Sequence, residues 1–213
     1  MRRLIGIATL IGLSMMSAAC ENPADGKARA AVSSASAEAT AKPAGSETLA
    51  ISPATSSIGF IGSKVTGSHT GSFQGFSGTI NLVADKVENS QVAVEIDMAT
   101  VASDDDRLTG HLKSPDFFDV AKFPKATFVT TEIKPGASGG ATHTVTGNLE
   151  LHGVKKSITF PATIAVDTGA ATLNTEFAIN RKEFGILYPG KSDDLIRDEV
   201  VIRLAINAPR ARS

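Results

Sequence analysis

The sequence predicts an all-β protein built from antiparallel strands with one short helical insert. Apolar and polar residues alternate in segment after segment, as in 91–98, where Val92, Val94, Ile96 and Met98 share one face. A period of two is typical of strands with one buried and one solvent-facing side. Only one stretch has helical spacing, and turn residues such as those at 135–136 separate the strands.

Eight strands are expected, and they occupy residues 57–64, 71–82, 91–98, 126–133, 144–151, 158–166, 173–179 and 200–206. In the second of these, Phe73 and Phe76 are out of phase around Gly75, which indicates a bulge or bend. Eight antiparallel strands form either a two-sheet sandwich or a closed barrel, and the alternation alone does not decide between them.

The helical insert is expected within 104–113, between the third and fourth strands. Three aspartates at 104–106 suit a helix N-terminus, and Leu108 and Leu112 fall on one face. The whole connection, 99–125, is long enough to cover an opening of the fold.

The N-terminus has the pattern of a secretory signal peptide over residues 1–19. Arg2 and Arg3 precede an apolar stretch, 4–16, which is too short to span a bilayer, and small residues at 17–19 precede Cys20. This arrangement resembles the lipobox of bacterial lipoproteins, in which the cysteine is acylated and anchors the mature protein. The alternative is ordinary cleavage that leaves a free thiol. Cys20 is the single cysteine, so the exported chain has no disulfide of its own.

Residues 20–47 are predicted to be the lipidated cysteine and a disordered tether, because Val32 is the one large apolar residue between 21 and 47. A single domain at 48–207 and a tail at 208–213 follow. The formal net charge is −1 and no basic tract is present, which argues against nucleic acid as a partner.

Strands that pair in sequence order place alternate connections at the same end. The connections 65–70, 99–125, 152–156 and 181–197 would then form one end, called the loop end below. The connections 83–90, 134–141 and 168–170 would form the opposite end, together with both termini of the domain. The tether would therefore hold the loop end away from the membrane.

Several motifs are similar to those of the YceI-like family, in the same order along about residues 48–207. They are the stretches 64–69, 71–78, Arg107 with 111–120, 123–128, 147–156, 181–186 and 198–200. The resemblance implies an exported, lipocalin-like eight-stranded barrel that binds polyisoprenoids or related lipids in its interior. Val65 departs from the family, because many members have His at that position.

The resemblance favours an open lumen over a fully packed core, which periodicity alone leaves undecided. The residues expected to line it are Phe60, Val94, Ile96, Leu149, Phe160, Ile164 and Phe177. The residues expected at its mouth, where a head group such as phosphate would bind, are Arg181, Lys155, Lys156, Arg107 and His111. For Arg181, an ion pair with Asp198 is the alternative.

Two other classes of function are weighed against a lipid carrier. Asp104, Arg107 and His111 have helical spacing and suggest acid–base or metal chemistry, but the acids are explained by a helix start. The sequence contains no HExxH, GxSxG or phosphate-loop motif, so no enzyme and no cofactor or metal is predicted. A non-enzymatic protein that acts through its outer surface, for example in a stress response, is the main alternative.

The expected location is the periplasm of a Gram-negative bacterium, with a lipid anchor in a membrane. Glu21 follows the cysteine in place of the Asp associated with inner-membrane retention, which favours the outer membrane. The oligomeric state and the lipid are not predicted.

Overall fold

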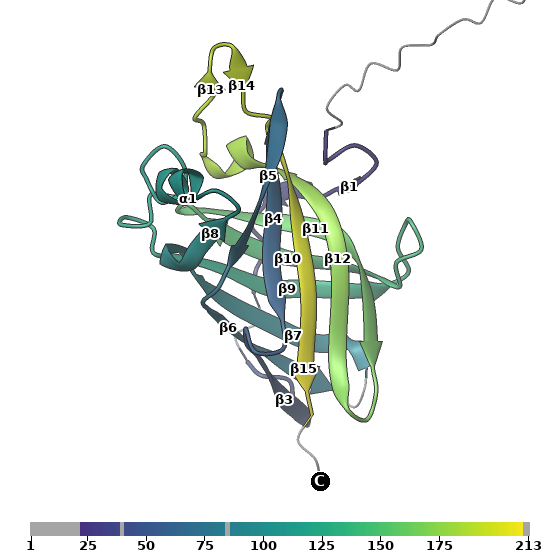
Figure 1. Cartoon of the computed structure of the whole chain (residues 1–213). Coiled ribbons are helices and arrows are strands. Elements are labelled where there is room, and N and C mark those ends of the chain that lie inside the picture. Colours follow the sequence, from purple (N-terminus) through teal and green to yellow (C-terminus); the bar gives the residue numbers. More distant parts are fainter. Residues whose placement is uncertain (1–21, 39–40, 84–85, 211–213) are drawn as a thin grey trace, which may run out of the picture.

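One continuous, curled sheet forms most of the molecule. The computed structural model describes residues 22–38, 41–83 and 86–210. Within them, thirteen strands belong to one sheet and two more form a separate hairpin, β13 (Gly190–Lys191) with β14 (Asp194–Leu195). The sheet bends round into a half-barrel (Figure 1), so the apolar faces of the strands turn towards one another. This is one curled sheet and not two stacked ones.

The strands pair almost entirely in sequence order. Along the sheet they are β3 (Ser46–Ile51), β6 (Phe76–Val83), β7 (Lys86–Asp97), β9 (Lys125–Pro135), β10 (His143–Leu151), β11 (Val154–Val166), β12 (Ala170–Asn180), β15 (Glu199–Pro209), β4 (Ser57–Lys64), β5 (Gly67–Phe73) and β8 (Val101–Ser103). All of these pairs are antiparallel.

All eight predicted segments form strands, but the predicted number of strands is wrong. The segment 71–82 is divided between β5 and β6, as the out-of-phase Phe73 and Phe76 suggested. The strand β3 was missed because its alternation, with Leu49 and Ile51 buried, is only six residues long and lies across the expected tether boundary. The very short strands leave too little alternation to detect.

The bend between β5 and β6 is held by a close backbone contact. A Cβ on Gly75 would lie 2.7 Å from Cγ2 of Thr100, so only glycine fits there without a shift. The Gly75 N–H donates to Oγ1 of Thr100 at 2.8 Å, and the Asp97 N–H donates to the Gly75 carbonyl at 2.9 Å. The strand is thereby fixed against the 3-10 helix η1 (Met98–Thr100).

The helix α1 (Asp106–Leu112) lies inside the stretch predicted to be helical. Asp105 caps it, accepting a hydrogen bond from the Leu108 N–H at 2.8 Å. It stands between β8 and β9, and therefore between the segments 91–98 and 126–133, with the unpredicted short strand β8 before it. A second 3-10 helix, η2 (Arg181–Phe184), follows β12. In the described residues, no helix is long and apolar enough to cross a membrane.

The sheet has a split that the sequence analysis did not anticipate. The strands β11 and β12 pair only from Thr163↔Asn174 to Val166↔Ala171, and they separate towards the loop end. Pro161 lies at the separation, lacks an N–H for the ladder, and its carbonyl accepts from the Thr175 hydroxyl at 2.6 Å. Proline in a sheet favours an edge, so Pro161 was the available signal.

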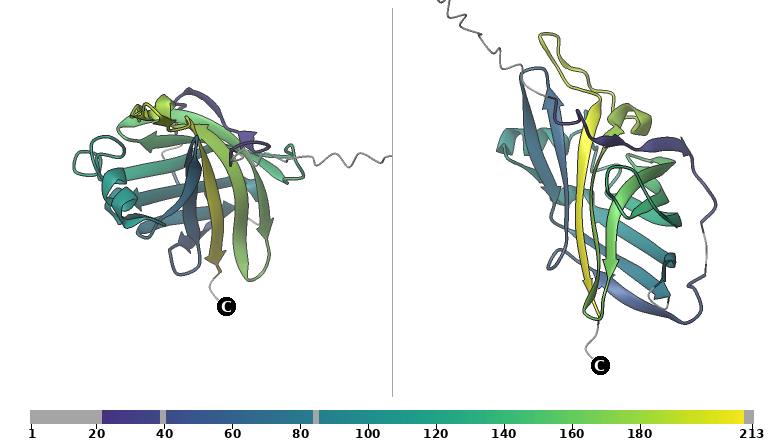
Figure 2. Two further views of the ribbon diagram at one scale, coloured as in Figure 1. Left: turned by 45° about the horizontal axis from the view of Figure 1, so that its top comes forward. Right: turned by 90° about the vertical axis from the view of Figure 1, so that its right-hand side faces the viewer.

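Residues 22–38, called the N-terminal strap, fill this split, which corrects the expectation of a disordered tether in this region. The strand β1 (Ala28–Arg29) pairs with β12, and β2 (Ala31–Ser34) pairs with β11. Val32 and Ala30 pack against the core cluster that contains Phe160 and Phe177. The strap is drawn in purple beside the green strands (Figures 1 and 2). The composition of this segment did not predict an ordered strap, because the partners that order it are the edges of β11 and β12, which lie far away in the sequence.

Asn148 holds the far end of the strap. It is 1% exposed, its side-chain amide donates to the Ser36 carbonyl at 2.7 Å and to Glu38 at 2.8 Å, and its oxygen accepts from the Ser36 N–H. Lys155 binds Glu38 at 2.7 Å. These hydrogen bonds, that from Lys155 first, lower the pKa of Glu38 and keep it charged.

The first described residues of the strap lie at the loop end, although the start of the predicted domain, near Glu47, lies at the opposite end as expected. Ala24 is 2% exposed and packs with Ile61, Ala178 and Val201, which lie near the loop-end limits of β4, β12 and β15. Arg210, the last described residue, is at the opposite end, where it binds Glu47. The predicted signal peptide and Cys20 lie outside the described residues.

We predict that Asn148→Ala releases the strap and leaves the sheet folded. The variant loses three hydrogen bonds in a buried position, which costs about 1–3 kcal/mol, and this corresponds to roughly tenfold or faster exchange of the amides of residues 31–36. Hydrogen exchange with mass spectrometry measures this. Asn81→Ala, which removes one exposed hydrogen bond to Thr48, is the matched control. Equal acceleration in β9 and β10 would contradict a local release.

Candidate functional site

An apolar cavity occupies the inside of the curled sheet. Its volume is about 260 Å³, and the side chains that line it are almost all aliphatic or aromatic. The polar side chains among them are Ser90, Thr130, Thr172 and Arg181. Protein interiors have few voids larger than a water molecule, and an apolar cavity of about 150 Å³ already admits a small aromatic ligand. The lumen is therefore larger than a packed core requires.

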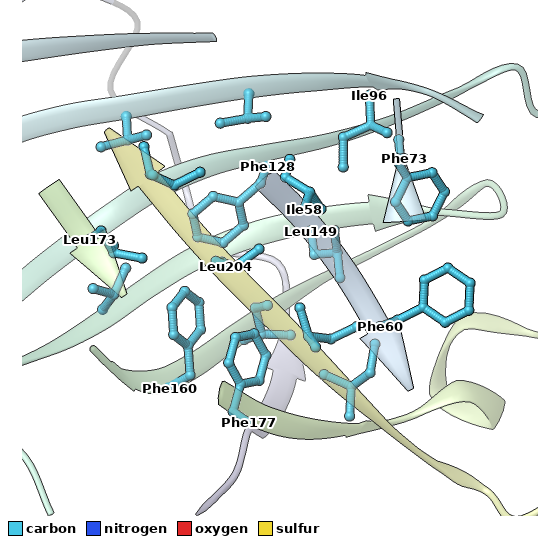
Figure 3. Close-up of a pocket in the computed structure, with 18 of the residues that line it drawn as sticks. Ile58, Phe60, Phe73, Ile96, Phe128, Leu149, Phe160, Leu173, Phe177 and Leu204 are labelled. Carbon is cyan, nitrogen blue, oxygen red and sulfur yellow. The ribbon is translucent and has the colours of Figure 1, made fainter. Parts of the chain in front are cut away.

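All seven residues predicted to line the lumen lie on the cavity wall. They come from β4 (Phe60), β7 (Val94 and Ile96), β10 (Leu149), β11 (Phe160 and Ile164) and β12 (Phe177). The rings of Phe160 and Phe177 stack with their centroids 4.2 Å apart, and Phe128 lies 5.9 Å from Phe160. Figure 3 shows these side chains and Leu149 on the cavity wall.

Five further wall residues that Figure 3 labels were not singled out from the sequence: Ile58, Phe73, Phe128, Leu173 and Leu204. Each belongs to a predicted strand, so the alternation could have found them. The alternation does not show that two glycines leave room for aromatic rings on the cavity wall. A Cβ on Gly71 would lie 2.2 Å from the Phe60 ring, and one on Gly147 would lie 2.4 Å from the Phe128 ring. Both rings lie where a side chain would otherwise stand.

The insert 99–125 and the segment 181–197 cover the loop end of the cavity. Leu112, Phe117 and Ile186 are buried together with Phe60. The His111 ring packs edge-on to Phe117 and to Tyr188, with centroids 4.9 and 5.1 Å apart. The insert thus covers this end of the cavity, as predicted, through a second cluster of side chains that is partly aromatic.

Arg181 is buried at this end, and its guanidinium is used within the protein. It is 4% exposed and donates to the carbonyls of Ile186, Arg197 and Ile196 at 2.8, 3.2 and 3.4 Å. Nη2 also lies 3.3 Å from Asp198, which is the ion pair weighed as the alternative. Burial lowers the pKa of Arg181, and the Asp198 charge opposes that effect. The geometry is that of a group that holds the 181–198 segment in place.

The other four residues predicted at the mouth do not converge on one point. Lys155 binds Glu38, and Lys156 binds Glu183. Arg107 is exposed on α1, and Nε2 of His111 lies 2.8 Å from Asp116. Both lysines thus have carboxylate partners, and a head group would have to compete with them.

The arrangement considered for an enzyme is not assembled. Asp104 binds His69 at 2.8 Å and accepts from the Thr70 N–H at 2.8 Å, whereas His111 is engaged with Asp116. The Thr70 N–H, followed by His69, lowers the pKa of Asp104. Over the described ranges, no group of three or more His, Cys, Asp or Glu side chains is placed to hold a metal ion.

Comparison with known proteins identifies the relatives of this fold. The profile of the YceI-like domain matches residues 49–208. A UPF0312 protein of Pseudomonas fluorescens (strain SBW25) is 37% identical over 132 residues, which is 59% of this chain and 68% of the relative. A UPF0312 protein of Pseudomonas putida (strain W619) is 35% identical over the same shares.

Solved structures agree with the curled sheet. BcnA of Burkholderia cenocepacia superposes with a TM-score of 0.65 at 26% identity, covering 74% of this chain and 99% of BcnA. A polyisoprenoid binding domain from Saccharophagus degradans, implicated in plant cell wall breakdown, superposes with a TM-score of 0.60 at 17% identity, covering 78% of this chain and all of that domain. The second likeness concerns the fold alone.

We predict that Arg181→Gln destabilises the fold because the carbonyl oxygens of Ile186, Arg197 and Ile196 lose their guanidinium donor, whereas Asp198 keeps its ion pair with Lys182. The free energy of unfolding should fall by about 1–3 kcal/mol, measured by urea denaturation. Arg203→Gln breaks a half-exposed pair with Glu176 and should cost about 0–1 kcal/mol. Unchanged stability with lost lipid binding would instead assign Arg181 to a head group.

Proposed function

Because the chain belongs to the YceI-like family, we propose that it binds a polyisoprenoid or a similar long apolar lipid in the cavity of the curled sheet. The observation that carries this proposal is the apolar cavity of about 260 Å³. The polyisoprenoid-binding domain of Saccharophagus degradans, which shares the fold, supports the class of ligand.

The chemistry of the wall favours a hydrocarbon chain over a polar ligand. A polar ligand needs hydrogen-bonding partners when it is buried, and the four polar side chains on the wall are few and dispersed. An isoprenoid chain needs none, and each buried methylene contributes about 0.8 kcal/mol. Part of that gain is lost in ordering the flexible chain. The seven predicted lumen residues are proposed as its contacts.

The proposed site of action is the periplasm of a Gram-negative bacterium. The basic and apolar residues before Cys20 support export, and the position of this cysteine supports acylation. We place the anchor in the outer membrane, following Glu21. An apolar lipid crosses water poorly, so a tethered protein with a sheltered cavity would act as its carrier or reservoir.

The protein is proposed to be a binding protein and not an enzyme, since Asp104 and His111 are engaged with separate partners. A surface-interaction or stress-response role without a ligand remains the competing function. It requires that the cavity stay empty in the cell, which the following experiment examines.

Native mass spectrometry with organic extraction, on the full chain purified from its membrane, tests the proposal. We expect a co-purifying isoprenoid or comparable lipid. Ile164→Trp, on the cavity wall, should fill part of the cavity and weaken binding about tenfold or more, since wrong volume in a site excludes the ligand.

Ala165→Trp provides the matched control. It adds the same ring one residue along β11, on the exposed face of the strand, and should leave lipid binding unchanged. A clean apo mass that stays clean after incubation with polyprenyl lipids would refute the carrier function and favour the surface role.

A further inference from the structure

The strap determines where the folded part begins. Because Ala24 is buried against Ile61, Ala178 and Val201, the described chain begins at the loop end. Cys20 precedes Asn22 by two residues, and two residues span at most about 7 Å. An acyl anchor on Cys20 would therefore be attached beside the loop end, and not at the opposite end, where Arg210 lies.

Exposed apolar side chains gather at this same end. Among the described residues, the large hydrophobic side chains that are exposed are Val65, Leu187 and Leu195, at 56%, 63% and 50%. Single exposed apolar residues are ordinary on soluble proteins. These three lie in the β4–β5 turn, the segment after η2 and the strand β14, all of which belong to the loop end. Their shared location distinguishes them from random scatter.

The segments that bear them brace one another. The Val65 N–H donates to the Leu195 carbonyl at 3.2 Å, and the Ile196 N–H donates to the Pro189 carbonyl at 2.9 Å. Asp194 binds Lys64 at 2.6 Å and also accepts from the Thr66 hydroxyl. The β13–β14 hairpin projects beyond the end of the sheet (Figure 1). The apolar side chains are therefore held on a framework in which Lys64 and Asp194 are paired, while the charged Lys191 and Asp193 at the tip of the hairpin are exposed and can stay among the lipid head groups.

We propose that the exposed apolar side chains of the β4–β5 turn, the segment after η2 and β14 contact the lipid bilayer that holds the anchor, so that the loop end faces the membrane. Val65, Leu187 and Leu195 enter the boundary between head groups and acyl chains, as the apolar side chains of interfacial segments do. The proposal rests on the anchored state given under the proposed function.

Tryptophan fluorescence tests the orientation without background, because the chain contains no tryptophan. The full acylated chain carrying Leu195→Trp or Val65→Trp is placed in vesicles of phosphatidylethanolamine and phosphatidylglycerol, with acylation verified by intact mass. Lipids brominated near the head groups should quench both tryptophans. Raised salt should not reverse the quenching, because the contact is apolar and not ionic.

Ser138→Trp, in the exposed turn between β9 and β10 at the opposite end, is the control and should stay unquenched. Quenching at Leu195→Trp no greater than at Ser138→Trp would overturn the proposal. So would an unmodified Cys20 in the intact mass. A second copy of the chain is the other possible occupant of this surface. If the two tryptophans are shielded from water when a vesicle holds several copies but exposed when it holds about one, the surface binds a second copy and the proposal is equally overturned.

The readout is independent of the lipid cargo. Quenching at the loop end with an empty cavity would keep the docking surface and refute the carrier function. A bound isoprenoid without quenching would keep the carrier function and refute the docking surface.

Discussion

The bend between β5 and β6 is the constraint on which the rest of the structure depends. These two strands are separated by two residues in the chain, yet they lie near opposite ends of the sheet path. A sheet whose ends are joined by so short a link cannot stay open and flat. Gly75 permits the bend because Thr100 occupies the space of its missing side chain. The curl then turns every apolar strand face towards a common interior.

The curled sheet has one place where neighbouring strands do not pair, and the strap fills it. The strands β11 and β12 separate beyond Pro161, which would expose two unpaired edges and the cluster around Phe160 and Phe177. The strap supplies a strand to each edge and covers the cluster with Val32. The strap begins at the loop end, where Ala24 is buried. Any anchor attached just before the strap is therefore also held near the loop end.

The interior and the loop end divide the chemistry of the molecule between them. The interior offers shape and apolar surface, with hardly any polar group to select a particular head group. The loop end carries the buried Arg181, the aromatic cover of the cavity and the exposed apolar tips. Under the proposed function, such an interior would select a ligand by chain length and bulk, not by its head group.

The sequence by itself determined the strands, the bend and the inward face, since alternation, out-of-phase phenylalanines and Gly75 are local properties of the chain. The seven lumen residues were predictable for the same reason. The tertiary structure alone decided the course of the strap, the partners of Arg181 and the location of Ala24. Each of these depends on contacts between residues more than a hundred positions apart or on carbonyls presented by a loop, and composition or periodicity contains no information about such partners.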